Sequence, residues 1–160
     1  MNSDYITDKA RLRICTLRKL QKLGASEQFI IYVYKKEIRS ILEYGVPVWN
    51  GAITKQDSLK IENIQKIVLR LLLREKYTSY TDACKNFKLE KLHERREKLC
   101  IKFARKEYAK PENGIFLKSQ TKSKRITSKK LVVEPRARTT RYYNSSLPYL
   151  ARLLNTHGTK

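Results

Sequence analysis

Long apolar runs are absent from this sequence. No stretch approaches the roughly 18 consecutive apolar residues that a membrane span requires. The N-terminus carries Asp4 and Asp8 in place of the apolar region of a secretory signal. The sequence therefore predicts that the chain is not secreted and has no membrane partner, and we expect it in the nucleus or the cytoplasm.

Cysteine is scarce, and its spacing excludes two kinds of small domain. The three cysteines, Cys15, Cys84 and Cys100, are odd in number and widely separated, so they form neither a C-x-x-C zinc knuckle nor a disulfide framework. Each lies among apolar neighbours in a predicted helix, which indicates a small buried side chain. This cysteine usage fits a reducing compartment.

Clustered carboxylates of the kind that hold catalytic metal ions are also missing. No Asp-Asp pair and no D-x-D occurs, and Asp4, Asp8, Asp57 and Asp82 stand at predicted helix starts, where capping and the helix dipole explain them. The histidines are far apart in sequence, and no Ser/His/acid set, Cys/His set or G-x-x-x-x-G-K-[ST] loop is indicated. We expect no catalytic residue, no metal site and no cofactor, and hence no enzyme from this chain on its own.

Positive charge is what the sequence has in excess. Its 36 Lys and Arg residues face 15 Asp and Glu residues, which gives a formal net charge of +21. Such a charge favours a polyanionic partner, either nucleic acid or an acidic membrane surface. A ribosomal-type protein or a merely soluble basic protein is the alternative, and the composition favours nucleic acid.

Apolar residues recur at three- and four-residue spacing at the start of the chain, which predicts two helices. The first spans residues 3–23 and ends at Gly24, a common C-terminal stop. The second begins after Ser26, a good N-cap residue. It stops at Gly45 and, because proline lacks the backbone donor, cannot resume through Pro47.

Three further helices follow in the first 110 residues. Thr54 opens the third with a capping-box-like T-K-Q-D, and its wide apolar face predicts the central helix of the domain. A short helix is expected at residues 79–87 and a longer one at 92–110, ended by Pro111. The inward-facing residues of the long helix are expected to be Leu92, Leu99, Cys100 and Phe103. Residues 1–110 therefore predict an all-α fold, a bundle of about four to five helices.

The remainder of the chain differs in composition. From residue 111 onward there are 11 Lys and Arg residues against two acids. We expect a basic flexible segment at 111–144, in which residues 119–130 are disordered and Leu131–Val133 form a short strand. Apolar residues return from Ser145, which predicts a terminal helix within 145–160 that docks on the bundle.

Basic residues at helical spacing are the candidate nucleic-acid contacts, because they can follow successive phosphates. In the first helix these are Arg11, Arg13, Arg18, Lys19 and Lys22. In the long helix they are Arg95, Arg96, Lys98, Lys102, Arg105 and Lys106. The alternative is a solvated face, or pairing of Arg95 and Arg96 with the neighbouring Glu94 and Glu97, and for those two arginines the alternatives are evenly balanced.

Ten tyrosines and one tryptophan complete the set of candidate residues. Tyr34 and Tyr44 lie on or near an apolar stripe, which favours burial in the core over base stacking. The pair formed by Tyr142 and its neighbour, flanked by Arg138 and Arg141, is the better stacking candidate. Trp49 follows the Gly/Pro elbow and is expected to cover the end of the bundle.

Four segments in order resemble the part of a non-LTR retrotransposon reverse transcriptase (an RNA-directed DNA polymerase) that lies C-terminal to its catalytic palm. Residues 38–49 are similar to "I-R-x-I-L-E-Y-G-x-P-x-W", and residues 61–66 to "L-E-x-x-Q-K". Residues 92–106 are similar to "L-x-x-R-R-x-x-L-x-x-K-F-A-x-K", and residues 141–148 to the family's closing segment. The resemblance implies a helical thumb and an extension that holds a template–primer duplex.

The sequence contains no Y-x-D-D motif, so the resemblance implies a non-catalytic piece: a truncated element copy, a gene-model fragment or a domesticated protein. We expect it to grip RNA or an RNA/DNA duplex through phosphates, with an upstream polymerase palm or a second copy of the chain as further possible partners. The alternatives are a helical protein–protein interaction module, or a remnant without function.

Overall fold

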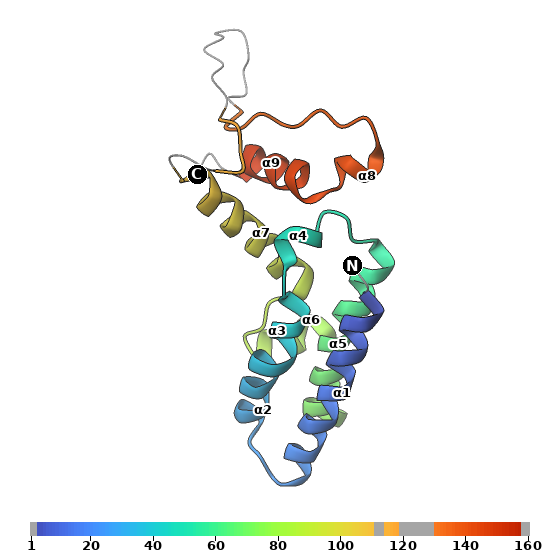
Figure 1. The fold of residues 1–160 in the computed structure, drawn as a ribbon. Helices are drawn as coiled ribbons and strands as arrows, with labels where there is room; N and C mark the ends of the chain where they lie inside the picture. The colour runs from blue at the N-terminus through green and yellow to red at the C-terminus, as the bar shows by residue number, and fades with distance from the viewer. Residues whose placement is uncertain (1–2, 111–113, 119–129, 158–160) are drawn as a thin grey trace. The chain divides into compact units, whose positions relative to one another are not determined.

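The computed structural model describes residues 3–110, 114–118 and 130–157, and its regular elements are helices (Figure 1). Among these residues the strand-like structure is limited to an isolated antiparallel bridge between Lys118 and Val132. The predicted all-α class is confirmed, with more helical segments than the four to five expected, and the strand expected around Val132 is reduced to the bridge. The segment 119–129, expected to be disordered, lies outside the described residues, as does Pro111.

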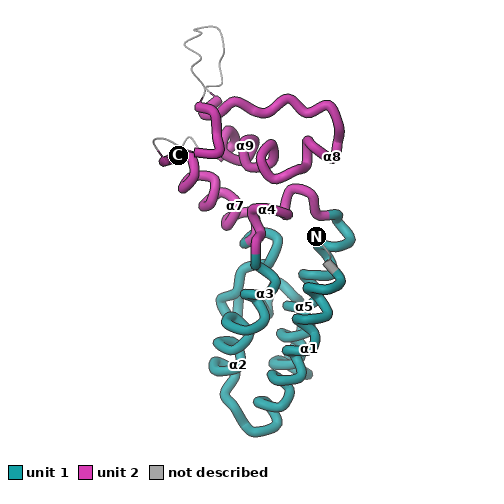
Figure 2. Tube along the Cα trace, in the orientation of Figure 1, with its two compact units in different colours: residues 1–44, 54–95 teal, residues 45–53, 96–160 magenta. Residues whose placement is uncertain are grey.

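The chain divides into two compact units (Figure 2). Unit 1 comprises residues 1–44 and 54–95, and unit 2 comprises residues 45–53 and 96–160. The long helix expected at residues 92–110 is shared between them: its first turn belongs to unit 1, and the rest belongs to unit 2.

Unit 1 begins with a helical hairpin. Helix α1 (Ser3–Lys22) is followed closely by Gly24, which adopts φ +80° and is the predicted glycine stop. The next helix starts after Ser26, whose hydroxyl accepts a hydrogen bond from the Phe29 amide at 3.3 Å. This helix is continuous, but it changes from α-helical to π-helical geometry and back. Its parts are α2 (Glu27–Val33), a π-helical turn η1 (Tyr34–Ile38) and α3 (Arg39–Glu43). The π-helical turn was not predicted.

The rest of unit 1 is built by capped helices. Its elements are α5 (Lys55–Leu73), the 3-10 turn η2 (Arg74–Lys76), α6 (Tyr80–Asn86) and the first turn of α7 (Leu92–Tyr108). Thr54 and Ser79 each accept a hydrogen bond from the amide three residues later, at 3.1 Å, and bond to that residue's carboxylate. These N-terminal caps place Asp57 and Asp82 in the first turns of their helices, as predicted.

Helices α1 and α5 run parallel, side by side (Figure 1). Lys60, near the start of α5, donates to Asp4 at the start of α1 at 2.7 Å. Gln21, near the end of α1, donates to the Leu71 carbonyl near the end of α5 at 2.8 Å. The core between these helices and the α2–α3 segment consists of buried apolar residues, among them Ala10, Ile14, Leu17, Ile30, Ile38, Leu42, Ile61, Ile64 and Val68.

Unit 2 contains a short helix that the sequence did not predict, α4 (Val46–Trp49). It begins directly after Gly45, which adopts φ +64°, and Pro47 lies in its first turn, where a missing backbone donor costs nothing. The expectation that no helix passes Pro47 was therefore wrong. The preceding helix ends at Glu43, two residues before Gly45, and a new one starts at Val46.

The C-terminal helix of unit 2, α9 (Ser146–His157), confirms the predicted terminal helix. It packs against the segment around α4, where Ser146 donates to the Pro47 carbonyl and Asn50 donates to the Tyr149 hydroxyl, both at 3.0 Å. A Cβ on Gly51 would lie 2.6 Å from Tyr149 Cβ, so only glycine fits this approach. A further short helix, α8 (Thr140–Tyr143), was not predicted.

One amide side chain holds the extended segment 131–134 of unit 2. Asn155 Oδ1 accepts from the Leu131 and Val132 amides at 2.9 and 3.1 Å, and its Nδ2 donates to the Val132 carbonyl and to Glu134 at 3.1 and 2.9 Å. The hydrogen bond from Asn155 holds the pKa of Glu134 below its ordinary value, with the charge of Lys130 adding to the effect.

Several burial predictions are decided by these helices. Cys84 and Cys100 are buried as predicted, whereas Cys15 is exposed, because the inward face of α1 is formed by other residues. Tyr34 is fully buried, but Tyr44 is 82% exposed, because it follows the last turn of α3 in an extended conformation. Phe103, expected inside, is 36% exposed at the edge of the buried row of α7.

Candidate nucleic-acid interface

The two central arginines of the predicted interface are used inside the units that contain them. In unit 1, Arg95 Nε donates to the Glu43 carboxylate, a hydrogen bond that raises the pKa of Arg95, and Arg39 lies 3.4 Å from the same carboxylate. In unit 2, the Arg96 side chain is 2% exposed and its guanidinium lies 5.8 Å from the centre of the Trp49 ring. Arg95 therefore pairs with Glu43 and not with Glu94 or Glu97, the alternative expected from the sequence, and Arg96 does not present its charge to solvent.

A buried amide joins three parts of unit 1. Gln65 is fully buried and accepts a hydrogen bond from the Tyr34 hydroxyl at 2.7 Å. Its own amide donates to the Tyr80 hydroxyl and to the Glu90 carbonyl, both at 2.9 Å. Burial raises the pKa of the Tyr34 hydroxyl far above its ordinary value, so this hydroxyl stays a donor.

A buried carboxylate caps the start of α7. Glu62 accepts hydrogen bonds from the Leu92 and His93 amides at 2.9 and 3.1 Å and from the Tyr80 hydroxyl. The position favours an anion, because unpaired amides and the positive end of the helix dipole meet there. Burial, and then the bond to Glu62, raise the pKa of Tyr80. Glu62 and Gln65, two residues of the segment 61–66, therefore have structural roles.

Sequence reasoning missed these two roles, although a signal was present. Glu62 and Gln65 are polar residues on the side of α5 that also carries Ile61 and Leu69, and a polar side chain on an apolar helix face requires buried partners. The partners themselves come from other helices and leave no local pattern.

The five basic residues of α1 that were predicted as contacts are all exposed, but they do not share one face. Arg13 lies on the flank towards η1 and pairs with Glu37 at 2.6 Å. Arg11 and Arg18 follow Asp4 at intervals of seven residues and therefore lie on the same flank as Asp4. Because Asp4 contacts Lys60, this flank adjoins α5.

We call Arg11, Arg18, Lys19 and Lys22 the α1 basic row. Lys22 lies on the same flank as Arg18, one helical turn further along. Lys19 lies beside this flank, towards the outer side of the helix. Arg11 pairs with Asp8 at 3.2 Å. Within the described residues, the other three members of the row form no ion pair. Their charges therefore face solvent unneutralised by the fold.

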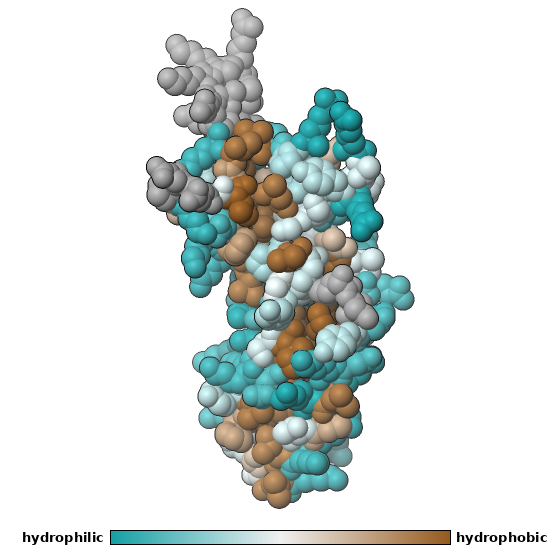
Figure 3. Space-filling model, viewed as in Figure 1, coloured by the Kyte–Doolittle hydropathy of each residue, from teal (hydrophilic) through white to brown (hydrophobic). Residues whose placement is uncertain are grey.

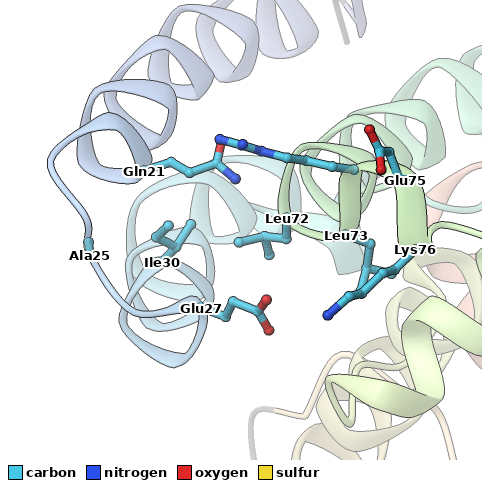
Figure 4. Close-up of a pocket in the computed structure, with 9 residues that line it drawn as sticks. Gln21, Ala25, Glu27, Ile30, Leu72, Leu73, Glu75 and Lys76 are labelled. Atoms are coloured by element: carbon cyan, nitrogen blue, oxygen red, sulfur yellow. The ribbon is translucent and has the colours of Figure 1, made fainter.

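A polar pocket of about 460 Å³ lies where α1 and α5 end. Figure 4 shows Glu27 and Lys76 extending from opposite sides of it, with Gln21 near its edge. The charged residues that line it are Glu27, Arg74, Glu75 and Lys76. Two acids oppose two cations, so the pocket is a weak site for an anion.

The surface of α5 adds two basic residues that were not predicted as contacts. The charged groups of Lys66 and Arg70 lie 5.4 and 5.2 Å from the ring centres of Tyr80 and Tyr77. Their spacing of four residues on the polar side of α5 is the signal that would have identified them.

In unit 2, the predicted residues of α7 occupy its outer face. Lys102, Arg105 and Lys106 are exposed, on the side opposite the buried Cys100 and Ala104. Arg105 donates to the His157 carbonyl at 2.7 Å, which fixes the end of α9. The lysines keep their charges on the surface.

Arg141 and Tyr142 lie on α8, which is capped by Thr139 through a 3.2 Å bond from the Tyr142 amide. Tyr142 is 43% exposed, and Arg141 is exposed beside it. The neighbouring Tyr143 has the guanidinium of Arg152 against its ring at 3.7 Å from the centre. Of the two tyrosines, Tyr142 is therefore the better stacking surface.

Among the described residues, no group of His, Cys, Asp and Glu side chains is arranged to hold a metal ion, and no helix is long and apolar enough to cross a membrane. Comparison with protein-family models, with curated proteins and with solved structures finds no match.

Proposed function

We propose that this chain is a non-catalytic nucleic-acid-binding module that holds an RNA or RNA/DNA duplex by its phosphates, with the α1 basic row as the principal contact. One observation carries the proposal: Arg18, Lys19 and Lys22 are exposed and form no ion pair with the described residues. Acids elsewhere in unit 1, such as Glu43 and Glu62, bind groups within the fold and do not neutralise these three cations. The row is therefore a place where positive charge is available to a polyanion.

The row is long enough for several phosphates. From Arg11 to Lys22 the helix rises about 16 Å, at about 1.5 Å per residue. A duplex offers a negative charge every ~1.7 Å of its axis, and each neutralised phosphate lowers the slope of log affinity against log salt by about 0.9. Three unpaired cations therefore account for a slope of about −3.

Binding of a fluorescent RNA/DNA duplex over a salt series tests the row. The variant Arg18→Gln/Lys19→Gln/Lys22→Gln is expected to weaken binding and to make the salt slope shallower by about 3. The matched control is Lys55→Gln/Lys76→Gln/Lys85→Gln, which removes the same charge from exposed positions elsewhere in unit 1. Equal losses in both variants, or a salt slope that the first variant leaves unchanged, would overturn the assignment.

The proposed module catalyses no reaction itself. A module of this kind positions a duplex for a catalytic domain, and the upstream palm of a polymerase is the partner that the resemblance of residues 38–49, 61–66 and 92–106 suggests. Double-stranded RNA and double-stranded DNA in the same assay establish which duplex is preferred. Equal affinity for all three at each salt concentration would count against a template–primer role.

A second candidate, a protein–protein interaction module, has a specific observation in its favour. Tyr5, Leu12 and Leu23 are 63%, 74% and 82% exposed and share the outer face of α1. Figure 3 shows brown apolar patches between hydrophilic areas on the unit 1 part of the face in view. This candidate would be supported by a sedimentation coefficient that rises with protein concentration in a chain that does not bind nucleic acid. The variant Leu12→Gln/Leu23→Gln would then remove the concentration dependence.

A further inference from the structure

An open pocket of about 460 Å³ lies between α1 and α3 in unit 1. Its lining is mainly apolar and aromatic, and it consists of Tyr5, Ile6, Lys9, Ser40, Ile41 and Tyr44. The volume is within the range of pockets that hold small ligands, about 300–1,000 Å³. None of these residues belongs to the α1 basic row.

Two exposed tyrosines distinguish this pocket. Tyr5 is 63% exposed and Tyr44 is 82% exposed, although tyrosine normally buries most of its ring. Ile6 and Ile41 are half-buried and add apolar surface to the lining. Lys9 supplies a cation whose ammonium lies 5.9 Å from the centre of the Tyr5 ring.

We infer that this pocket receives an unpaired nucleobase, which stacks on Tyr5 and Tyr44 while Lys9 contacts the adjoining phosphate. Planar aromatic bases stack on phenol rings, and every base has such a face, so the contact is independent of sequence. A lysine at the rim suits a nucleotide better than an apolar peptide, which has no charge to neutralise. The inference deepens the proposed function and rests on it.

The pocket lies on the other flank of α1 from the row. Lys9 is four residues before Arg13, which contacts Glu37 of η1, so Lys9 lies on the flank towards α2–α3. A helix with its side chains is about 10–12 Å across. A blunt duplex that binds along the row is therefore expected to leave the pocket empty. A single strand that extends from the end of the duplex is expected to place a base in it.

The test compares a blunt RNA/DNA duplex with the same duplex carrying a short single-stranded overhang. The overhang is expected to raise the affinity of the unaltered chain roughly 5- to 150-fold for each stacked base. Tyr5→Ala/Tyr44→Ala is expected to abolish this gain and to leave the affinity for the blunt duplex unchanged. Tyr5→Phe/Tyr44→Phe keeps the rings and is expected to retain the gain.

A matched control exists on α2 and η1. Tyr32 and Lys36 form the same exposed pair at four-residue spacing, with 5.8 Å between ammonium and ring centre, and do not line this pocket. Tyr32→Ala is expected to leave the overhang gain intact. The inference is overturned if the unaltered chain shows no gain, if the gain survives Tyr5→Ala/Tyr44→Ala, or if Tyr32→Ala removes it equally.

The failures of the two proposals are distinguishable. If the blunt duplex binds through the row but the overhang adds nothing, the pocket inference alone fails. If substitution of the row leaves binding to the blunt duplex unchanged, the proposed interface fails, while an overhang gain that depends on Tyr5 and Tyr44 still supports the pocket. If self-association depends on the two tyrosines and the overhang gain does not, the occupant is a second copy of the chain and the inference is overturned.

Discussion

Units 1 and 2 carry similar numbers of cations but very different numbers of acids. Unit 1 has 19 Lys and Arg residues against 11 acids, and unit 2 has 17 against four. In unit 1, acids such as Glu37, Glu43 and Glu62 bind arginines or cap a helix. Net charge alone therefore does not locate an interface, because the placement of the acids decides which cations remain available.

The units also differ in how their distant segments are joined. Unit 1 joins α2–α3, α5, α6 and α7 through a buried carboxylate and a buried amide, Glu62 and Gln65. Unit 2 uses one partly exposed amide, Asn155, and a close backbone approach at Gly51. Removing a buried polar group leaves its partners unsatisfied, so the joining contacts of unit 1 are the more costly ones to lose.

The largest effect is expected from Glu62→Ala, which tests whether the buried carboxylate is the main tie of unit 1. The change leaves the Tyr80 hydroxyl and the Leu92 and His93 amides without their acceptor. Because bonds to a charged group contribute about 1.5–3 kcal/mol each and buried donors are costly to leave unmet, we expect a loss of about 3 kcal/mol or more. Urea denaturation followed by far-ultraviolet circular dichroism measures it.

Glu75→Ala is the control for that variant. Glu75 is exposed, so its loss is expected to change the free energy of unfolding by no more than about 0.5 kcal/mol. If Glu62→Ala were as mild as Glu75→Ala, the contrast between the two units would disappear.

Local structure was predictable from the sequence wherever its cause is local. Ser26 and Thr54 mark helix starts because a hydroxyl and an amide three residues later are enough to form a cap. Gly24 marks a helix end because its backbone adopts positive φ. The two helices that were missed, α4 and α8, have only four residues each, too few for a periodic pattern.

The candidate site was less predictable, because its residues are sorted by tertiary contacts. In the sequence, the neighbouring Glu94 and Glu97 set Arg95 and Arg96 apart from Arg18, but the partners in the structure, Glu43 and Trp49, lie far away along the chain. Tyr44 sits one position beyond its helix, and an apolar stripe does not reveal that boundary.

The next effect is expected in unit 2, from Gly51→Ala. The added methyl group would lie 2.6 Å from Tyr149 Cβ and 2.7 Å from the Asn144 carbonyl oxygen, so α9 has to shift. Overpacking of this kind costs about 1–3 kcal/mol. Fluorescence of Trp49, the only tryptophan and a residue of unit 2, follows the transition. The control is Ala52→Ser, at the exposed neighbouring position, which is expected to leave the urea midpoint unchanged. If Gly51→Ala and Ala52→Ser had the same urea midpoint, unit 2 would tolerate rearrangement here.

The smallest effect is a pH dependence that separates the buried network of unit 1 from its surface. Burial raises the pKa of Tyr34 above the ordinary value of about 10, so above that pH the unfolded chain releases a proton that the folded chain keeps. The stabilising effect is complete below about pH 10 and is lost as the pH rises further, by up to about 1.4 kcal/mol per pH unit.

Tyr34→Phe is expected to reduce this slope in urea denaturation between about pH 9 and 11, whereas Tyr32→Phe, at an exposed position, leaves it unchanged. Equal slopes for the two variants would mean that the Tyr34 hydroxyl is open to solvent, and the buried link from Tyr34 to Gln65 could not then be what joins the π-helical turn to α5.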